Sequence, residues 1–93
     1  MDPIGKLAIK AARLIEERGH CKGVFSDDEG RLCIKSAISM AATPDRGRLG
    51  LRLKVDRLMP IIGCSSLVGW NDAPERTAED VIDVLVAAAY WED

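Results

Sequence analysis

Hydrophobic and polar positions along the chain repeat with the period of an α-helix over most of its length. After Asp2-Pro3, apolar residues recur every three or four positions as far as Ile15, and charged residues take the opposite side. Asp2 is a favourable N-cap, and proline is well tolerated at the first helical position. A first helix is therefore predicted from Pro3 to Gly19, where a glycine supplies the stop.

The segment HCKGVFSDDEGRLCI, which follows, contains a strong turn signal between two short apolar runs. SDDEG is a dense cluster of turn-forming residues. It either closes a short β-hairpin near residues 22–34 or links, as a loop, to the next helix. We expect that second helix to cover about residues 33–42, with a short extended pair before it.

Thr43-Pro44 repeats the pattern of a cap followed by proline and begins a third predicted helix, which ends near Pro60 or Gly63. Alternate leucines from Leu49 onward are also compatible with a strand, but the length of the segment and its lack of turn residues favour the helix. On a helical wheel, one broad apolar arc is expected to face the core. That arc contains Leu51, Val55, Leu58, Met59 and Ile62.

Two leucines of the third helix fall outside this arc and lie between arginines. An apolar centre with a charged rim is typical of a protein interface. We therefore expect the helix to form a self-association or partner-binding surface, and the alternative is that the helix is sandwiched in the core. The predicted surface consists of Leu49, Leu53, Arg46, Arg52 and Arg57.

The last helix is predicted from Ala78 to Trp91, after a segment, GCSSLVGW, that indicates a loop with one short helical turn. Thr77 and Asp80 have the spacing of a capping box, in which each side chain bonds the other residue's backbone N–H. Apolar residues cover more than half of this helix's wheel. A helix of that kind is packed on several sides, so we expect it to be central.

The stretch WNDAPERT before the last helix concentrates polar residues and could indicate either a helix start or a reaction centre. Asn71 and Asp72 suit a turn in which their side chains bond nearby backbone N–H groups, and Trp70 suits a core position with its indole N–H on a loop carbonyl. The alternative makes Asp72 and Arg76 ligand-binding or acid–base groups. No nucleophile or histidine lies beside them in the sequence, so the structural interpretation is favoured.

Length and composition indicate one soluble globular domain over residues 1–93. Of these residues 47% are hydrophobic and 30% charged, whereas only 4% are aromatic, which favours an all-α, closely packed bundle of about four helices. Lys6 and Lys10 interrupt the apolar start, so no signal peptide is predicted, and no segment has the length of a membrane span. We expect a cytoplasmic protein.

The three cysteines fit a reducing compartment, because their number is odd and their spacing matches no disulfide framework. Cys21, Cys33 and Cys64 with His20 form no chelating pair of the kind found in zinc sites. His20 and Cys21 are adjacent in sequence, where side chains usually point apart. The sequence therefore predicts buried structural thiols, no metal, no cofactor and no catalytic residues.

Charge is unevenly distributed around a net value of −2. Residues 46–57 hold five basic side chains against Asp56, whereas residues 72–93 hold seven acidic side chains against Arg76. A basic helix over residues 46–58 makes nucleic-acid binding an alternative function, with arginines on phosphates. The negative charge of the whole chain disfavours it.

Three stretches together, LIEERGHCKG, DDEGRLCIKSAI and WNDAPERTAEDVIDVLVAAA, resemble a family of small uncharacterised domains encoded by actinobacteria and their phages. The resemblance spans nearly the whole chain and implies a compact, mostly helical domain without a known activity. His20 stands where that family commonly has an aromatic residue, and Lys35-Ser36 stand where it usually has Gly-Ala. The residues that match the family's WNDxxxRT element, and are implied as a shared structural core, are Trp70, Asn71, Asp72, Arg76 and Thr77.

The function that these observations favour is protein interaction without catalysis. We expect a small module, of phage or prophage origin, that binds a host protein or a second copy of itself. A nucleic-acid-binding regulator remains the alternative. No feature of the sequence names the partner.

Overall fold

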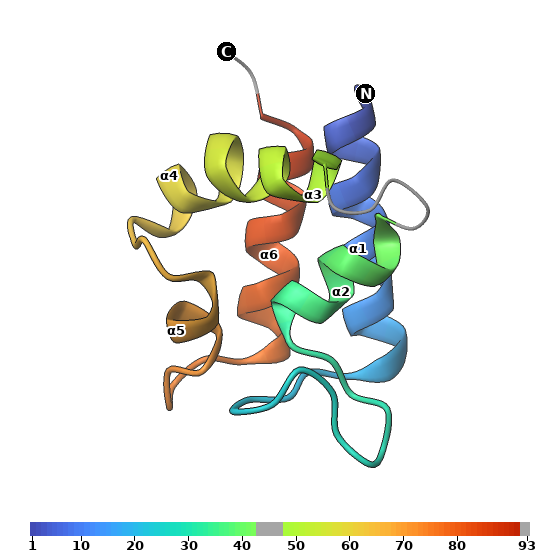
Figure 1. The fold of residues 1–93 in the computed structure, drawn as a ribbon, viewed down its shortest axis with the longest axis vertical. Helices are drawn as coiled ribbons and strands as arrows, with labels where there is room; N and C mark the ends of the chain where they lie inside the picture. The colour runs from blue at the N-terminus through green and yellow to red at the C-terminus, as the bar shows by residue number, and fades with distance from the viewer. Residues whose placement is uncertain (43–47, 92–93) are drawn as a thin grey trace.

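The chain is helical through most of the residues that this computed structural model describes, which are 1–42 and 48–91. The predicted bundle of about four helices is confirmed, and a further short helix joins it. Two long helices, α1 (Pro3–Arg18) and α6 (Ala78–Ala89), pack side by side as the back layer of Figure 1. They approach closely because Gly5 lacks a side chain: a Cβ there would lie 2.8 Å from the carbonyl oxygen of Ala89.

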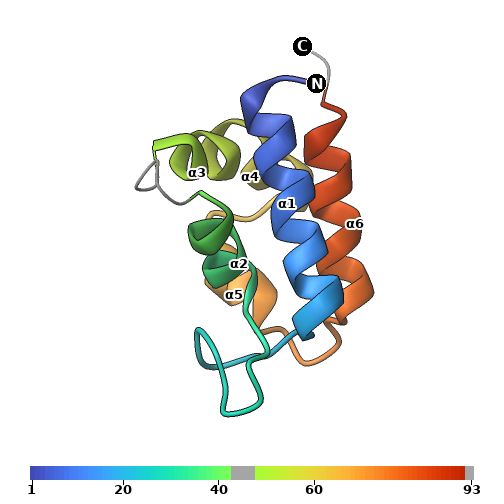
Figure 2. The ribbon, with the colours of Figure 1, turned by 90° about the vertical axis from the view of Figure 1, so that its right-hand side faces the viewer.

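The front layer holds two shorter helices, α2 (Ile34–Ala41) and α5 (Leu67–Asn71), which pack against each other. Figure 2 shows this layer on the left and the α1–α6 layer on the right. The segment that connects α1 to α2 lies at the lower end of the molecule, below both layers (Figure 1).

The first helix begins and ends as predicted. The side chain of Asp2 accepts a hydrogen bond of 2.8 Å from the backbone N–H of Gly5, and Pro3 occupies the first helical position. Gly19 ends the helix with φ of 92°, a conformation that side chains disfavour.

The segment between α1 and α2 is a loop with two isolated bridges rather than a regular hairpin. Leu32 pairs with both His20 and Ser26, and no longer strand forms in the part of this segment, residues 20–33, that lies between the helices. Cys33 then caps α2, because its Sγ accepts from the N–H of Ser36 at 3.4 Å. The expected extended pair is therefore reduced to two isolated bridges within a loop.

A third helical run crosses the upper end of both layers (Figure 1). It consists of α3 (Arg48–Arg52), a wider π-helical stretch η1 (Leu53–Leu58) and α4 (Met59–Ile62), and Gly63 ends it with φ of 66°. The preference for a helix over a strand is thus confirmed for these residues. The predicted start at Thr43-Pro44 lies outside the described part of the chain.

The predicted faces of this helix are only partly correct: Leu58 is buried and Ile62 packs against the core as expected, but other residues do not lie where the wheel placed them. Leu53 is fully buried and Leu49 is half-buried against the core, whereas Leu51 is 61% exposed. Arg57 is also buried, with 9% of its surface exposed. The expected exposed stripe therefore does not exist, and neither Leu53 nor Arg57 is presented to a partner in this structure. The alternative, a helix sandwiched in the core, describes it better.

The π-helical stretch explains part of this error. In a regular α-helix, Leu53 and Leu58 would lie about 140° apart around the axis. Here the N–H of Met59 bonds the carbonyl of Lys54, five residues back, and the wider turn brings both leucines into the core. Pro60 follows directly, and its ring has no N–H for the carbonyl that a regular helix would offer it.

The last helix starts with the predicted capping box. Thr77 Oγ1 accepts from the N–H of Asp80, and Asp80 Oδ2 accepts from the N–H of Thr77, both at 3.1 Å. The inner face of α6 then packs on α1 and on the third helical run. Its fully buried core residues include Val81, Leu85 and Ala88.

Candidate functional site

Asn71 is fully buried at the lower end of the molecule and connects three segments that are far apart in sequence. Its Oδ1 accepts from the backbone N–H of Ile34 at 2.9 Å and from Nε2 of His20 at 2.8 Å. Its Nδ2 donates to the carbonyl of Cys21 at 3.1 Å and to Oδ1 of Asp72 at 2.9 Å. All four hydrogen-bonding positions of the amide are therefore satisfied.

Asp72, the C-cap of α5, is hydrogen-bonded to the exposed side of the same loop. Its Oδ1 accepts from the N–H of Gly23 at 3.0 Å, and this bond, followed by the one from Asn71, lowers the pKa of the carboxyl. Beside it, Lys22 Nζ donates to the carbonyl of Pro74 at 2.8 Å. The first residues of the loop between α1 and α2, residues 20–23, are thus bound by the segment that precedes α6.

Arg76 joins this segment to the start of the last helix. Its guanidinium lies over the ring of Trp70, 4.0 Å from the ring centre, and its Nε donates to the carbonyl of Trp70 at 2.9 Å. Nη1 lies 3.9 Å from the carboxylate of Asp80, which completes the capping box with Thr77. The five motif residues therefore belong to one structural corner.

The sequence identified these residues as a motif, but it did not predict that their hydrogen bonds reach residues far away along the chain. Asn71 and Asp72 were expected to bond nearby backbone, whereas three of their partners, His20, Ile34 and Gly23, lie far away along the chain. His20 takes part directly: because Asn71 Oδ1 accepts, the Nε2 of the imidazole carries the hydrogen. His20, which stands where the family described above commonly has an aromatic residue, therefore belongs to this corner.

The cysteines occupy three different environments. The buried Cys21 thiol faces the carbonyls of Val24 and Arg31 at 3.5 and 3.3 Å, and burial raises its pKa. Cys33 is buried as the cap of α2, and Cys64 is half-buried beside Ser66. Within residues 1–42 and 48–91, no group of three or more potential ligands is placed to hold a metal ion.

Two arginines on the described part of the third helix, Arg52 and Arg57, are paired with carboxylates. Arg57 Nη1 donates to the carbonyl of Ala88 at 3.1 Å, and Nη2 pairs with the carboxylate of Asp2. This contact with Arg57 is the main reason that the pKa of the Asp2 carboxyl is lowered, and the N–H of Gly5 lowers it further.

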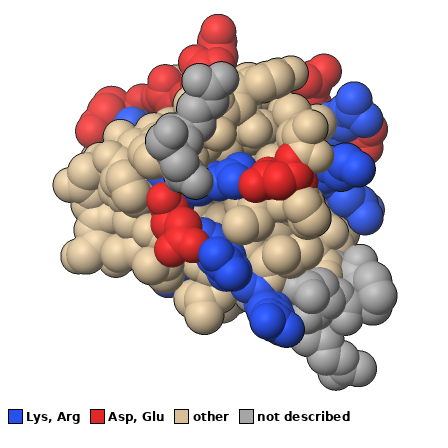
Figure 3. Space-filling model, turned by 90° about the horizontal axis from the view of Figure 1, so that it is seen from above, with Lys and Arg blue, Asp and Glu red and all other residues tan. Residues whose placement is uncertain are grey.

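Further along the helix, Arg52 pairs with Asp56 at 3.4 Å, and Arg46 lies outside the described residues. Figure 3, a view onto the upper end of the molecule, shows acidic side chains interspersed with basic ones. The buried Arg57 is thus not available for a phosphate contact, whereas Arg48 and Arg52 are exposed.

A hollowed band, which we call the front groove, runs over the front layer. Three adjoining hollows of about 480, 210 and 300 Å³ extend from the corner to the third helix; Phe25 lines both the first and the second, and Lys35 lines both the second and the third. The residues that define the front groove are Val24, Phe25, Lys35, Leu51, Lys54 and Val68.

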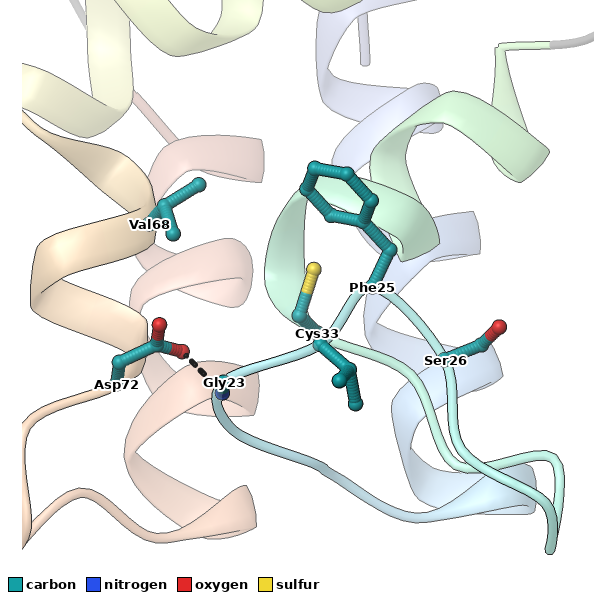
Figure 4. A pocket seen from close by; sticks show the side chains of 7 residues that line it. Gly23, Phe25, Ser26, Cys33, Val68 and Asp72 are labelled. Carbon is teal, nitrogen blue, oxygen red and sulfur yellow. Dashed lines mark hydrogen bonds between the residues drawn. The ribbon is translucent and has the colours of Figure 1, made fainter.

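Figure 4 shows the lower part of the groove, where Val68 and Asp72 of α5 face Gly23, Phe25 and Cys33 across the hollow. Phe25 is 59% exposed, and Lys35 Nζ lies 5.5 Å from the centre of its ring. The sequence analysis did not identify these residues as a site. The adjacent apolar pair Val24-Phe25 next to a turn was the one available signal.

No helix among the described residues is both long and apolar enough to cross a membrane. Residues 1–90 match the model of a family of unknown function, DUF6197, and the chain belongs to that family. No curated protein and no solved structure matches the chain.

Proposed function

We propose that this protein is an interaction module whose front groove binds an acidic, partly apolar segment of a partner protein. The observation that carries this proposal is the groove itself: a concave band in which large apolar side chains stay in contact with solvent. Phe25 and Leu51 are each exposed over more than half of their surface, and Val24 and Val68 line the same hollow as Phe25. Contiguous exposed apolar surface of this kind favours a binding role.

The charges of the groove determine the chemistry of the partner. Lys35 and Lys54 line it as cations, whereas its one acid, Asp72, already accepts from Gly23 and Asn71. A partner segment that places carboxylates on the two lysines and apolar side chains on Phe25 and Leu51 matches both properties.

We further propose that the module works without catalysis, in the cytoplasm, and that it is phage- or prophage-encoded in an actinobacterial setting, as the sequence resemblance implies. The contacts of the chemically versatile side chains support a structural role for them. His20 donates to Asn71, Cys33 caps α2, and the raised pKa of Cys21 keeps its thiol protonated.

A display library of random peptides, selected on the purified protein, tests the proposed partner chemistry. We expect enriched peptides to combine acidic and apolar residues, and a synthetic peptide from the selection to shift the amide signals of the groove residues in NMR titrations. Enrichment of basic peptides, or shifts that map to α1 and α6, would contradict the proposal.

Matched variants locate the binding surface. Leu51→Asp should lower the affinity for the selected peptide about tenfold or more, because it removes a leucine from the interface. Val55→Asp is the control, since Val55 is also exposed on the same helix but does not line the groove. Equal binding by both variants would place the site elsewhere.

A charge reversal at both groove lysines, Lys35→Glu with Lys54→Glu, should also abolish binding of the acidic peptide, and Lys6→Glu with Lys10→Glu on α1 is the matched control. Duplex DNA serves as a second probe. We expect no association that weakens steeply with salt. A tight DNA complex that Arg48→Ala weakens would replace our proposal with the nucleic-acid alternative.

A further inference from the structure

A second hollowed surface lies on the opposite side of the molecule, along the line where α1 meets α6. This surface, which we call the back seam, is an open hollow of about 500 Å³. Figure 2 shows that α1 and α6, which line it, form the layer beside α2 and α5. Both helices contribute to it. Its principal residues are Ile9, Arg13, Glu16, Ile82, Val86 and Tyr90.

The back seam accounts for the unusual composition of α6. Apolar residues cover more than half of this helix's wheel, as in helices that are packed on several sides. Val81 and Leu85 are buried, but Ile82 and Val86 are only half-buried and Tyr90 is 67% exposed. Within the described chain, no element covers this outer face, so part of the apolar surface of α6 has no partner in the monomer.

The charges of the seam are complementary to those of an identical surface. Arg13 and Glu16 are the charged residues that line it, they are both exposed, and neither has an ion-pair partner among the described side chains. In a two-fold dimer the same patch faces itself, so that residue i of one copy meets residue j of the other, and the reverse. Each Arg13 can then pair with the other copy's Glu16.

The front groove has the opposite property. Its free charges, on Lys35 and Lys54, have the same sign, and apposing two such grooves would bring cations together. Of these two exposed surfaces, only the back seam therefore carries unpaired charges of both signs that can complement a second copy of itself.

We propose that the back seam is the surface through which two copies of this chain associate, in a two-fold dimer with reciprocal Arg13–Glu16 pairs at its centre and apolar contacts from Ile82, Val86 and Tyr90. The proposal is independent of the function assigned to the front groove. It also leaves both grooves of the dimer open.

Sedimentation velocity over a range of protein concentrations measures the association. We expect a reversible dimer for the native chain. Arg13→Glu and Glu16→Arg should each weaken it at least about tenfold, because each variant places like charges opposite each other. Circular dichroism should show intact helices, since both side chains are solvent-exposed.

A mixture of the two single variants provides the decisive measurement. In a reciprocal interface, the acidic seam of Arg13→Glu faces the basic seam of Glu16→Arg, so a one-to-one mixture should restore the dimer as a heterodimer. The double variant Arg13→Glu with Glu16→Arg should dimerise like the native chain. Tyr90→Ser should weaken the dimer without affecting the fold, and the groove variant Lys54→Glu should leave it unchanged.

Three outcomes would overturn the proposal. A native chain that stays monomeric up to about 1 mM has no significant self-affinity. Single charge variants that dimerise like the native chain would show that the seam is not the interface. Loss of the dimer in Lys54→Glu, with the seam variants unaffected, would assign self-association to the front groove.

Discussion

The two ends of the molecule each bury one polar side chain. At the lower end it is the neutral amide of Asn71, and at the upper end it is the charged guanidinium of Arg57. Each side chain connects parts of the chain that are distant in sequence. Asn71 is fully enclosed and satisfies all its hydrogen bonds without removing a charge from water. Arg57 is paired with Asp2, whose side chain is half-exposed.

The difference indicates what each end depends on. A buried neutral group that is fully hydrogen-bonded is insensitive to salt and to mild pH changes, but it is costly to truncate, because its partners are left unsatisfied. A buried charge needs its counter-charge, so the stability that it provides depends on the ionisation of that partner. The Asn71 amide should therefore be less sensitive to salt than the Arg57–Asp2 pair, and less tolerant of truncation.

Truncation at the lower corner should have the largest effect. Asn71→Ala leaves the N–H of Ile34 and the carbonyl of Cys21 without their partner, and we expect a loss of about 3 kcal/mol in the free energy of unfolding. Chemical denaturation followed by circular dichroism measures it. Val68→Ala, on the exposed side of the same short helix, is the control and should be nearly neutral. A loss below about 1 kcal/mol would show that water replaces the amide at little cost.

Substitution of Arg57 at the upper end should cause the second-largest loss in the free energy of unfolding. Arg57→Met keeps the apolar part of the side chain but leaves the carbonyl of Ala88 and the carboxylate of Asp2 unpaired, and we expect it to cost about 2 kcal/mol. Arg52→Met is the matched control, because its exposed pair with Asp56 contributes about 0.5 kcal/mol at most. Equal losses in the two variants would mean that the buried pairing has no special role.

The cap of α6 tests how much a purely local contact contributes beside the long-range ones. Thr77→Ala removes the acceptor for the N–H of Asp80 and should lower the free energy of unfolding by about 1 kcal/mol. Thr77→Ser keeps the oxygen and should behave like the native chain. If Thr77→Ala proved as costly as Asn71→Ala, the corner would depend on the helix start rather than on the amide.

The smallest effect concerns pH. The pKa of Asp2 is lowered below its ordinary value of 3.8, chiefly by Arg57, so its ionised form stabilises the fold above that value. This contribution is lost as the pH falls through the lowered pKa of the folded state. In Asp2→Asn, the free energy of unfolding should consequently fall less between pH 5 and pH 2 than in the native chain. An identical pH dependence in both proteins would contradict the assignment.

Local signals made the helices predictable, and long-range contacts explain what was missed. The caps at Asp2 and Thr77 depend on residues within one turn, so spacing alone located both helix starts. The partners of Asn71 lie dozens of positions away, and no local rule identifies them. Some faces of the third helix were predicted wrongly for two reasons. A helical wheel assumes a constant rotation per residue, which the π-helical stretch Leu53–Leu58 violates. In addition, the burial of Arg57 depends on contacts with both ends of the chain.

The sequence analysis singled out the motif residues Trp70 to Thr77, but it expected the exposed apolar stripe of the third helix at positions that are in fact partly or fully buried. Leu51 was assigned to the core and is exposed, whereas Leu53 was assigned to the surface and is buried. The front groove and the back seam each combine residues from separate helices. Such combinations depend on how the layers pack, which periodicity along one segment does not determine.

The amide proton of Ile34 is a natural reporter on the motions of the lower corner. It belongs to the first residue of α2, where helical N–H groups normally lack an intrahelical acceptor and exchange rapidly with solvent. Here it is bonded to Asn71 Oδ1 in a buried position. Its exchange with deuterium should therefore require the loop, α5 and the start of α2 to separate together, so that three segments behave as one cooperative unit with a single opening rate.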